Sequence, residues 1–153
     1  MKYFGVSNFT PSQFDLIQSR LEFSLVTNQV EFSVLHTAPL FDGTFDQAIM
    51  KNFQPMIWSP LAGGKLFAPE DKQDAQTKRV VATLKEIAAE IGPSVTIDQI
   101  AYAFILKHPC KPVIVVGTNN MDRLKRNADA VQIQLSKPQW FRILEASQGC
   151  EVP

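Results

Sequence analysis

The alternation of short apolar segments with helix-start signals is the feature that most constrains the fold of this chain. Four segments have the composition of buried β-strands, and each is followed by residues that favour a helix. These segments are residues 2–7, 25–32, 54–59 and 111–118. Strands that alternate with helices favour a parallel sheet with right-handed crossovers. The sequence therefore predicts an α/β fold in the order β-α-β-α-β-α-α-β-α-α.

Several helix starts are marked by capping boxes. In these boxes a Ser or Thr side chain and a Gln three residues later satisfy free N–H groups of the first turn. Such pairs occur at Thr10–Gln13, Thr44–Gln47, Thr96–Gln99 and Ser136–Gln139. Two further helices are expected to start near Lys78 and Asp122. In the second of these, the spacing of Leu124, Ala128 and Val131 predicts a buried face.

The composition fits one globular domain that spans residues 1–153. The chain is 45% hydrophobic and has 15 basic and 15 acidic residues, so no charge excess indicates a nucleic-acid or membrane-surface partner. The first residues lack the apolar region of a signal peptide. Cys110 and Cys150 lack the spacing of metal ligands, and two free thiols fit a reducing compartment. These observations predict a cytoplasmic protein without a metal site.

Amides, hydroxyls, one flat aromatic ring and several cations follow the four predicted strands. In parallel α/β folds the functional loops lie at the carboxyl ends of the strands. Amide side chains can satisfy a carboxamide, and an indole can stack on a flat ring. A glycine loop and arginines at a helix start can bind phosphate oxygens. Together these groups meet the needs of a nicotinamide dinucleotide.

Each of these residues also has a structural explanation. Asn8 can cap the helix that follows it, and Gln29 can be a satisfied polar residue near a strand end. Trp58 can belong to the core, and glycines are common in any loop. Arg123 and Arg126 can form a solvated helix face. The functional interpretation depends on the shared position of these residues at the strand ends.

Four motifs, in order, carry a resemblance to a known family. They are "FGVSNF", "TNQVEFS", "WSPLAGG" and "VVGTNNMDRLKRNADA". They resemble the C-terminal half of an aldo-keto reductase, in the bacterial branch of NADP(H)-dependent barrel oxidoreductases. The resemblance implies the last four β/α units of a (β/α)8 TIM barrel, with extra helices. It also implies NADP(H) as cofactor and a small carbonyl substrate.

The resemblance assigns the nicotinamide and pyrophosphate groups to residues after the first three strands. Ser7, Asn8 and Gln29 would contact the nicotinamide carboxamide. Trp58 would stack on the nicotinamide ring. The loop that follows would lie at the pyrophosphate, with the residues Ser59, Leu61, Gly63, Gly64 and Lys65.

The adenosine end is assigned to residues after the fourth strand. Asn119 and Arg123 match positions around the 2′-phosphate, and Asn127 matches the asparagine that binds adenine. Arg126 stands where many members have a glutamate that accepts from the adenine amino group. Asn119 replaces a frequent serine, and Thr118 stands near the place of a phosphate-binding lysine in some branches. Arg123 is therefore the main candidate for the 2′-phosphate.

The resemblance implies no catalytic residue in this chain. The family's Asp, Tyr, Lys and His come from the first half of the barrel, and neither Tyr3 nor Tyr102 matches the tyrosine acid. His36 is expected to be a loop residue. His108 is expected at a helix end, where the dipole favours a cation.

Two interpretations follow for the chain as a whole. In the first it is the cofactor-binding half of an NADP(H)-dependent reductase and is inactive alone. In the alternative it is a non-catalytic or regulatory half-barrel that binds a nicotinamide cofactor. A half-barrel would expose inward residues such as Phe4 and Ile57 to water, which predicts a homodimer if the half folds alone.

Overall fold

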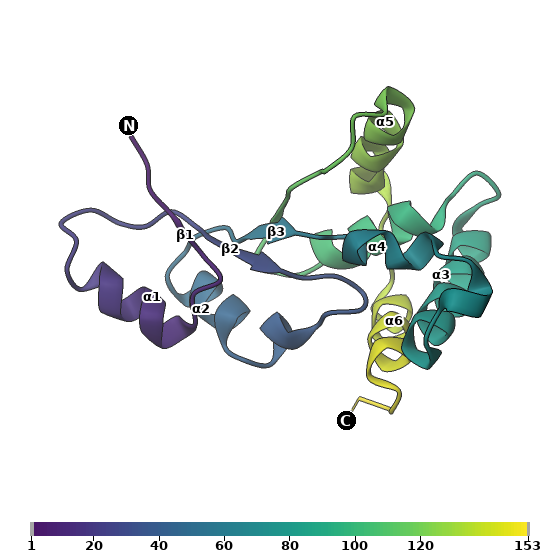
Figure 1. Cartoon of the computed structure of the whole chain (residues 1–153), viewed down its shortest axis with the longest axis horizontal. Helices are drawn as coiled ribbons and strands as arrows, with labels where there is room; N and C mark the ends of the chain where they lie inside the picture. Colours follow the sequence, from purple (N-terminus) through teal and green to yellow (C-terminus); the bar gives the residue numbers. More distant parts are fainter. Residues whose placement is uncertain (1, 153) are drawn as a thin grey trace.

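The four predicted strands form one parallel sheet. The structure is a computed structural model and describes residues 2–152. The strands lie in the order β1-β2-β3-β4, and all three pairs are parallel (Figure 1). Their bounds are β1 Val6–Ser7, β2 Asn28–Glu31, β3 Met56–Trp58 and β4 Val113–Ile114. Each strand lies inside its predicted segment but is shorter than it. The prediction of a parallel α/β sheet is confirmed.

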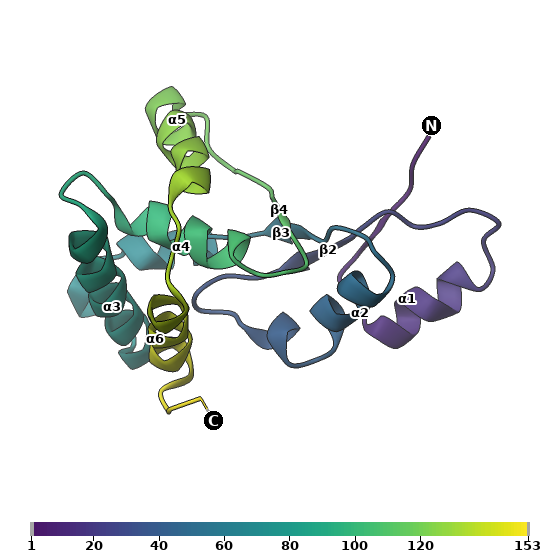
Figure 2. The same cartoon turned by 180° about the vertical axis from the view of Figure 1, so that it is seen from behind.

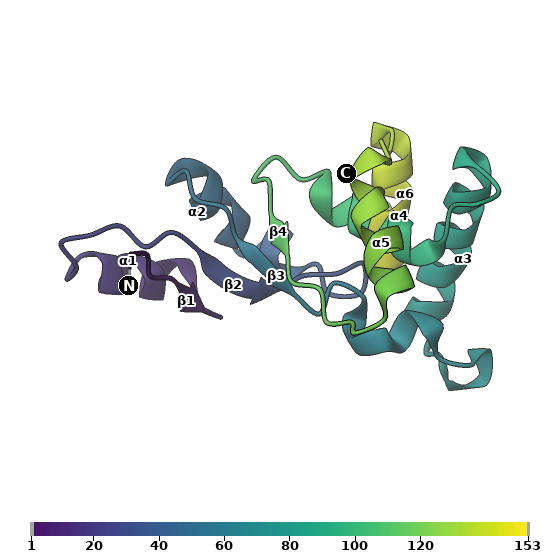
Figure 3. The same cartoon turned by 90° about the horizontal axis from the view of Figure 1, so that it is seen from above.

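Six α-helices follow the strands in the predicted order. They are α1 Pro11–Gln18, α2 Thr44–Met50, α3 Ala75–Ile91, α4 Ile97–Leu106, α5 Met121–Asp129 and α6 Lys137–Gln148. Short 3-10 helices occur at Ala38–Leu40, Ala62–Phe67, Glu70–Lys72 and Ala130–Gln132. Helices α1 and α2 lie along the β1–β2 side, and α3, α4 and α6 gather at the other end (Figure 3). Within residues 2–152 none of the helices combines the length and apolar composition that a bilayer crossing requires.

The sheet has one covered face and one open face. Val30 pairs with Ile57 and Ile57 with Ile114, and Val30 and Ile57 belong to the main hydrophobic core. On the opposite face, Val113 is 45% exposed. Ile57 is fully buried, so the expectation that it meets water is wrong: its position in the register turns it toward the helices. Phe4 is 43% exposed, as expected.

A chain of aromatic rings joins the sheet to the helices that carry the site. Phe32, directly after β2, contacts Phe45 of α2 edge-on at 4.8 Å and Phe104 of α4 at 5.7 Å. Trp140 of α6 stacks on Phe104 at 4.9 Å and donates its indole N–H to the Phe104 carbonyl at 3.0 Å. Aromatic pairs of this geometry add to the stabilisation from burial. This packing fixes α4 relative to the strand ends.

Three of the four predicted capping boxes are confirmed, those at Thr10, Thr96 and Ser136. The box at Thr44 is wrong because Thr44 is the first residue of α2 and makes no capping bond. Gln47 instead donates its side-chain N–H groups to the Pro11 carbonyl at 2.8 Å and to Asp15 Oδ1 at 3.0 Å. The side chain that sequence assigns to a cap therefore joins α2 to α1.

Helix α5 turns a different face inward from the one predicted. Leu124 and Val131 are 40% and 56% exposed, and Ala128 is also exposed. Asn127 and Ala130 are buried instead. Helix α5 projects from the rest of the chain (Figures 1 and 2). Its contact with α4 is made by polar side chains, which apolar periodicity does not reveal.

Candidate functional site

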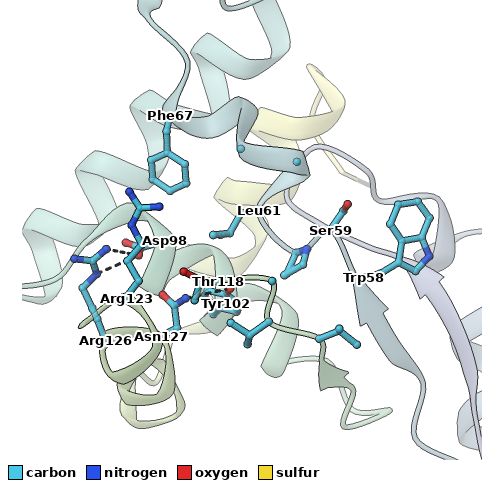
Figure 4. Close-up of a pocket in the computed structure, with 16 residues that line it drawn as sticks. Trp58, Ser59, Leu61, Phe67, Asp98, Tyr102, Thr118, Arg123, Arg126 and Asn127 are labelled. Atoms are coloured by element: carbon cyan, nitrogen blue, oxygen red, sulfur yellow. Dashed lines mark hydrogen bonds and ion pairs between the residues drawn. The ribbon is translucent and has the colours of Figure 1, made fainter. Parts of the chain in front are cut away.

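A cleft of about 770 Å³ lies at the carboxyl ends of β3 and β4 (Figure 4). Its walls come from the loop after β3, the segment after β4, and the facing sides of α4 and α5. The lining residues are Trp58, Ser59, Pro60, Leu61, Gly63, Gly64, Phe67, Asp98, Tyr102, Val115, Val116, Gly117, Thr118, Arg123, Arg126 and Asn127. The cleft therefore occupies the edge of the sheet where parallel α/β folds bind ligands.

Seven of the twelve residues expected at a cofactor line this cleft. They are Trp58, Ser59, Leu61, Gly63, Gly64, Arg123 and Asn127. Ser7, Asn8 and Gln29 lie at the neighbouring ends of β1 and β2. Lys65 lines a second cleft, and Asn119 is an exposed residue outside both linings. The structure thus brings the predicted residues to one edge of the sheet but separates Lys65 and Asn119 from the main cleft.

The β1 end is linked to the aromatic wall of the cleft by Asn8. The Trp58 indole N–H donates to Asn8 Oδ1 at 3.0 Å, and the Asn8 backbone N–H donates to the Gln29 carbonyl at 2.9 Å. Ser7 Oγ donates to the same carbonyl at 3.0 Å. Asn8 does not cap α1, because Thr10 does so. Its role in the fold is to orient the Trp58 ring.

The loop after β3 concentrates left-handed backbone conformations. The φ angles of Ser59 and Ala62 are 50° and 52°, and those of Gly63 and Gly64 are 62° and 88°. For non-glycine residues this conformation costs on the order of 1–2 kcal/mol, and such strain is concentrated at functional sites. A Cβ at Gly63 or Gly64 would meet no atom within 4 Å. The two glycines are therefore required by the turn of the chain, and they leave backbone exposed to the cleft.

One ion pair joins the two helices at the far end of the cleft. Arg126 of α5 donates from Nε and Nη2 to Asp98 Oδ2 of α4, at 3.1 and 3.0 Å. The Asp98 side chain is 6% exposed and that of Arg126 is 42% exposed. Gln99 adds a bond from its side-chain N–H to the Arg126 carbonyl at 3.1 Å. Arg126 is thus partly exposed and also forms part of the cleft wall.

Arg123 is the cation of the cleft that remains available to an anion. It is exposed, and no carboxylate within residues 2–152 forms an ion pair with it. Its backbone N–H is capped by Asn120 Oδ1 at 3.0 Å. A free guanidinium in the first turn of a helix is a favourable partner for a phosphate group.

Asn127 presents an unsatisfied acceptor in the same wall. It is 8% exposed, and its Nδ2 donates to the Tyr102 hydroxyl at 3.3 Å. Its Oδ1 is the one buried side-chain N or O atom among the described residues that has no hydrogen-bond partner. Burial, and to a lesser extent the charge of Asp98, raises the pKa of Tyr102, so its hydroxyl stays protonated. Buried polar atoms without partners are rare in folded proteins, and this one lines a cleft where a ligand could satisfy it.

The sequence did not predict that two residues of this wall would line the cleft. Asp98 and Tyr102 lie four residues apart on α4 and therefore share a helix face. Asp98 lies inside the capping box of α4, between Thr96 and Gln99, and its sequence context predicts only a helix start. The contact between α4 and α5 spans 28 residues of sequence, and no local pattern marks it.

The second cleft, of about 450 Å³, lies on the other side of the glycine loop. It contains Glu31, His36, Lys65 and Asp74. Asp74 caps α3 by accepting from the Thr77 N–H at 2.7 Å, which lowers the pKa of Asp74. His36 is an exposed residue in the loop after β2, as expected. The lining contains both acidic and basic side chains, so this cleft does not favour a ligand of one charge.

The surroundings of His108 oppose its protonation. It is half-buried against Phe45, with ring centroids 4.7 Å apart. Burial lowers the pKa of His108. Its Nδ1 lies 3.0 Å from Cys110 Sγ and accepts from the Cys110 backbone N–H at 3.3 Å. His108 thus lies just after the end of α4, as expected, and its burial, opposed by the charge of Asp46, disfavours the cation there.

The main cleft has the chemical order that a dinucleotide requires. Trp58 offers a flat face at one end, and the left-handed loop after it offers backbone donors. Arg123, Asn127 and Tyr102 offer a cation and hydrogen-bonding groups toward the α4–α5 end (Figure 4). The volume lies in the range of roughly 300–1,000 Å³ that is typical of cofactor sites. The residues of the chain therefore fit a nicotinamide dinucleotide.

Comparison with known proteins gives consistent similarities. The profile of the Aldo/keto reductase family matches residues 1–148. Oxidoreductase YdhF of Escherichia coli is 40% identical over the whole chain, which covers 49% of that protein. A 6-dehydroglucose reductase of Agrobacterium fabrum is 39% identical, with 99% of this chain and 48% of that protein covered. The chain spans about half the length of these relatives.

Solved structures show the same similarity in three dimensions. The thermostable aldo-keto reductase Tm1743, solved with the inhibitor epalrestat, has a TM-score of 0.77 and 25% identity. The alignment covers 95% of this chain and 48% of that protein. An aldose reductase from Giardia lamblia has the same TM-score at 18% identity, with 99% and 47% covered, which supports the fold alone.

Proposed function

The chain belongs to the aldo/keto reductase family, and on that premise we propose that it binds NADP(H) as the cofactor half of a carbonyl oxidoreductase. The family's oxidoreductase relatives support the reaction class. The observation that carries the proposal is the main cleft, because it gathers seven of the expected cofactor residues at one sheet edge.

The chain's own residues would bind and orient the cofactor. NADPH supplies a hydride to a carbonyl carbon. Trp58 would stack on the nicotinamide ring, and Asn8 would hold the indole in place through its Oδ1. The Asn8 Nδ2 makes no hydrogen bond to the described residues, so it is free to donate to the nicotinamide carboxamide oxygen. By family resemblance, a tyrosine acid with its Lys, Asp and His partners belongs to the first half of the barrel and would protonate the substrate oxygen.

Tryptophan fluorescence tests the proposal directly. The chain has two tryptophans, and Trp140→Phe leaves Trp58 as the reporter while a ring remains on Phe104. NADPH is expected to quench this fluorescence in a saturable way. Calorimetry on the wild-type chain should give a matching Kd. Absence of saturable binding by both methods contradicts the proposal.

The chain alone is expected to bind without turnover. Carbonyl-dependent oxidation of NADPH by the 153 residues, above the rate of a Trp58→Ala control, would contradict this part of the proposal. Co-expression with the first half of a related reductase tests the alternative, a non-catalytic binding module. Recovery of turnover favours the enzyme interpretation, and binding without any recovery favours the module.

The preference for NADP(H) over NAD(H) is assigned to Arg123. Its guanidinium is the unpaired cation of the cleft, so a 2′-phosphate would gain a charge-assisted bond there. Arg123→Ala should weaken NADPH binding roughly tenfold and leave NADH binding within about twofold. Arg20→Ala, an exposed arginine on the loop after α1, is the matched control. An equal loss for both nucleotides would contradict the assignment.

The open face of the sheet supports a homodimer of the isolated chain. Met56 and Val113 pair on this face, and Val113 is 45% exposed. Exposed apolar faces of sheets favour association. Light scattering of the pure chain should give about twice the mass of 17.1 kDa. Val113→Lys should shift it to monomer, and a wild-type monomer contradicts this proposal.

A further inference from the structure

We propose that Asp98 is a specificity-determining residue that recognises the amino group of the purine base at the α4–α5 end of the cleft. The inference rests on the proposed function, because it assumes that a dinucleotide occupies the cleft. It goes further by assigning base recognition to a residue of α4 that lies outside the family motifs in this sequence.

The two oxygens of the Asp98 carboxylate have different surroundings. Both donors of Arg126 go to Asp98 Oδ2. Oδ1 accepts no hydrogen bond from any side chain or backbone group within residues 2–152. Asp98 nevertheless lines the cleft, although the residue is only 4% exposed. Oδ1 is not among the buried side-chain atoms that lack a partner, so it keeps access to the cleft, where a carboxylate oxygen can accept a hydrogen bond from a ligand.

A second acceptor lies in the same wall. Asn127 Oδ1 is buried without a partner, and Tyr102 contributes a protonated hydroxyl between the two helices (Figure 4). Two acceptors and one donor complement an amino group next to a ring nitrogen. Adenine has this pattern at its 6-amino group. A base with a 6-oxo group would place acceptor against acceptor.

Arg126 explains why the acceptor comes from α4. Its guanidinium cannot accept a hydrogen bond, so α5 cannot supply the acid at this position. The ion pair draws Arg126 toward Asp98 and keeps the carboxylate fixed, with Oδ1 directed away from the guanidinium. Asp98 of α4 therefore supplies an acceptor at the end of the cleft where α5 carries Arg126.

The test compares NADPH with its hypoxanthine analogue by calorimetry. The two ligands carry the same charge, so any change in the positive charge of the cleft cancels in the ratio of their Kd values. The wild-type chain should prefer NADPH on the order of tenfold to a hundredfold. Asp98→Ala should reduce this preference to within about threefold.

Asp98→Asn provides the sharper variant because it keeps the shape of the side chain. Arg126 should retain the amide oxygen, which turns Nδ2 toward the cleft and replaces an acceptor by a donor. The preference should then fall to about one or reverse. Asp129→Asn, at the end of α5, is the control and should keep the wild-type ratio. Thermal unfolding of each variant confirms that the fold is retained.

The outcomes separate this inference from the proposed function. If neither nucleotide binds to the wild-type chain, the proposed function fails. If both bind equally, or if Asp98→Asn keeps the wild-type ratio, the cofactor proposal stands and the role of Asp98 is wrong. In that case Asp98 serves only to join α4 to α5.

Discussion

The bond between Asn8 and Trp58 can be isolated by a substitution that leaves the backbone unstrained. Asn8 has a φ of 55°, and glycine adopts this conformation without cost. Asn8→Gly therefore removes the acceptor of the 3.0 Å indole bond without a new clash. Asn52 also has a φ of 55° and lies at the end of α2, away from the cleft. Asn52→Gly is thus a control with the same backbone change.

The magnitude follows from the difference between the two variants. Both share the gain from relief of left-handed strain and the loss from a more flexible unfolded chain. What remains is one partly exposed hydrogen bond, worth about 0.5–1 kcal/mol. Asn8→Gly should therefore be less stable than Asn52→Gly by this amount in urea unfolding.

The effect on the ligand should exceed the effect on stability. Without Asn8 the Trp58 ring is free to rotate, and Asn8 Nδ2 is also lost. In the Trp140→Phe background, NADPH quenching should therefore require roughly tenfold more NADPH with Asn8→Gly and an unchanged amount with Asn52→Gly. If the two variants are alike in both stability and quenching, the argument for Asn8 as the support of Trp58 is refuted.

Four further predictions concern single residues. Gly117→Ala should leave the free energy of unfolding within about 1 kcal/mol of wild type. It should weaken NADPH binding, because the new methyl group enters open space beside the cleft. Gly64→Ala should lower the free energy of unfolding by about 1 kcal/mol, because the φ of Gly64 is 88°. Calorimetry and urea unfolding check both, and unchanged binding by Gly117→Ala contradicts the first. His108 has a lowered pKa, so the unfolded state takes up its proton first and stability should fall as the pH drops below about 6.5. His108→Gln should flatten this decline in urea unfolding measured across that pH range. Burial raises the pKa of Cys110 to about 12, so iodoacetamide at pH 8 should alkylate Cys110 only in denaturant. Mass spectrometry measures the labelling, and alkylation of Cys110 in the native chain would contradict this prediction.

The order and type of the elements could be predicted from the sequence because they depend on local patterns. Apolar runs marked the four strands, and capping residues such as Thr10 and Ser136 marked helix starts. The pattern failed where a polar side chain had a distant partner. Gln47 has the spacing of a capping box, but its partners lie on α1. Local spacing cannot distinguish these two uses of an amide.

In the candidate site, too, local patterns predicted some positions and failed for residues whose partners are distant in sequence. Ser59, Leu61, Gly63 and Gly64 follow β3 and line the main cleft, because the end of a strand determines where the next residues lie. The α5 face was predicted wrongly because Leu124 and Val131 are apolar yet exposed. The inward face of α5 instead carries Arg126 and Asn127, whose partners on α4 lie 28 and 25 residues away. Burial of polar groups requires such partners, and only the folded chain shows them.

The pairing of Asp98 on α4 with Arg126 on α5 limits what a motif can transfer from one protein to another. A motif compares positions one at a time, so Arg126 in place of an acid suggests a lost contact. A ligand, however, interacts with a set of atoms in space, whichever helix supplies them. Asp98 lies against Arg126 and offers a carboxylate oxygen to the same cleft, which compensates for the substitution. The position of the Asp98 carboxylate, and not the charge at position 126 alone, therefore determines which groups of a ligand the wall can accept.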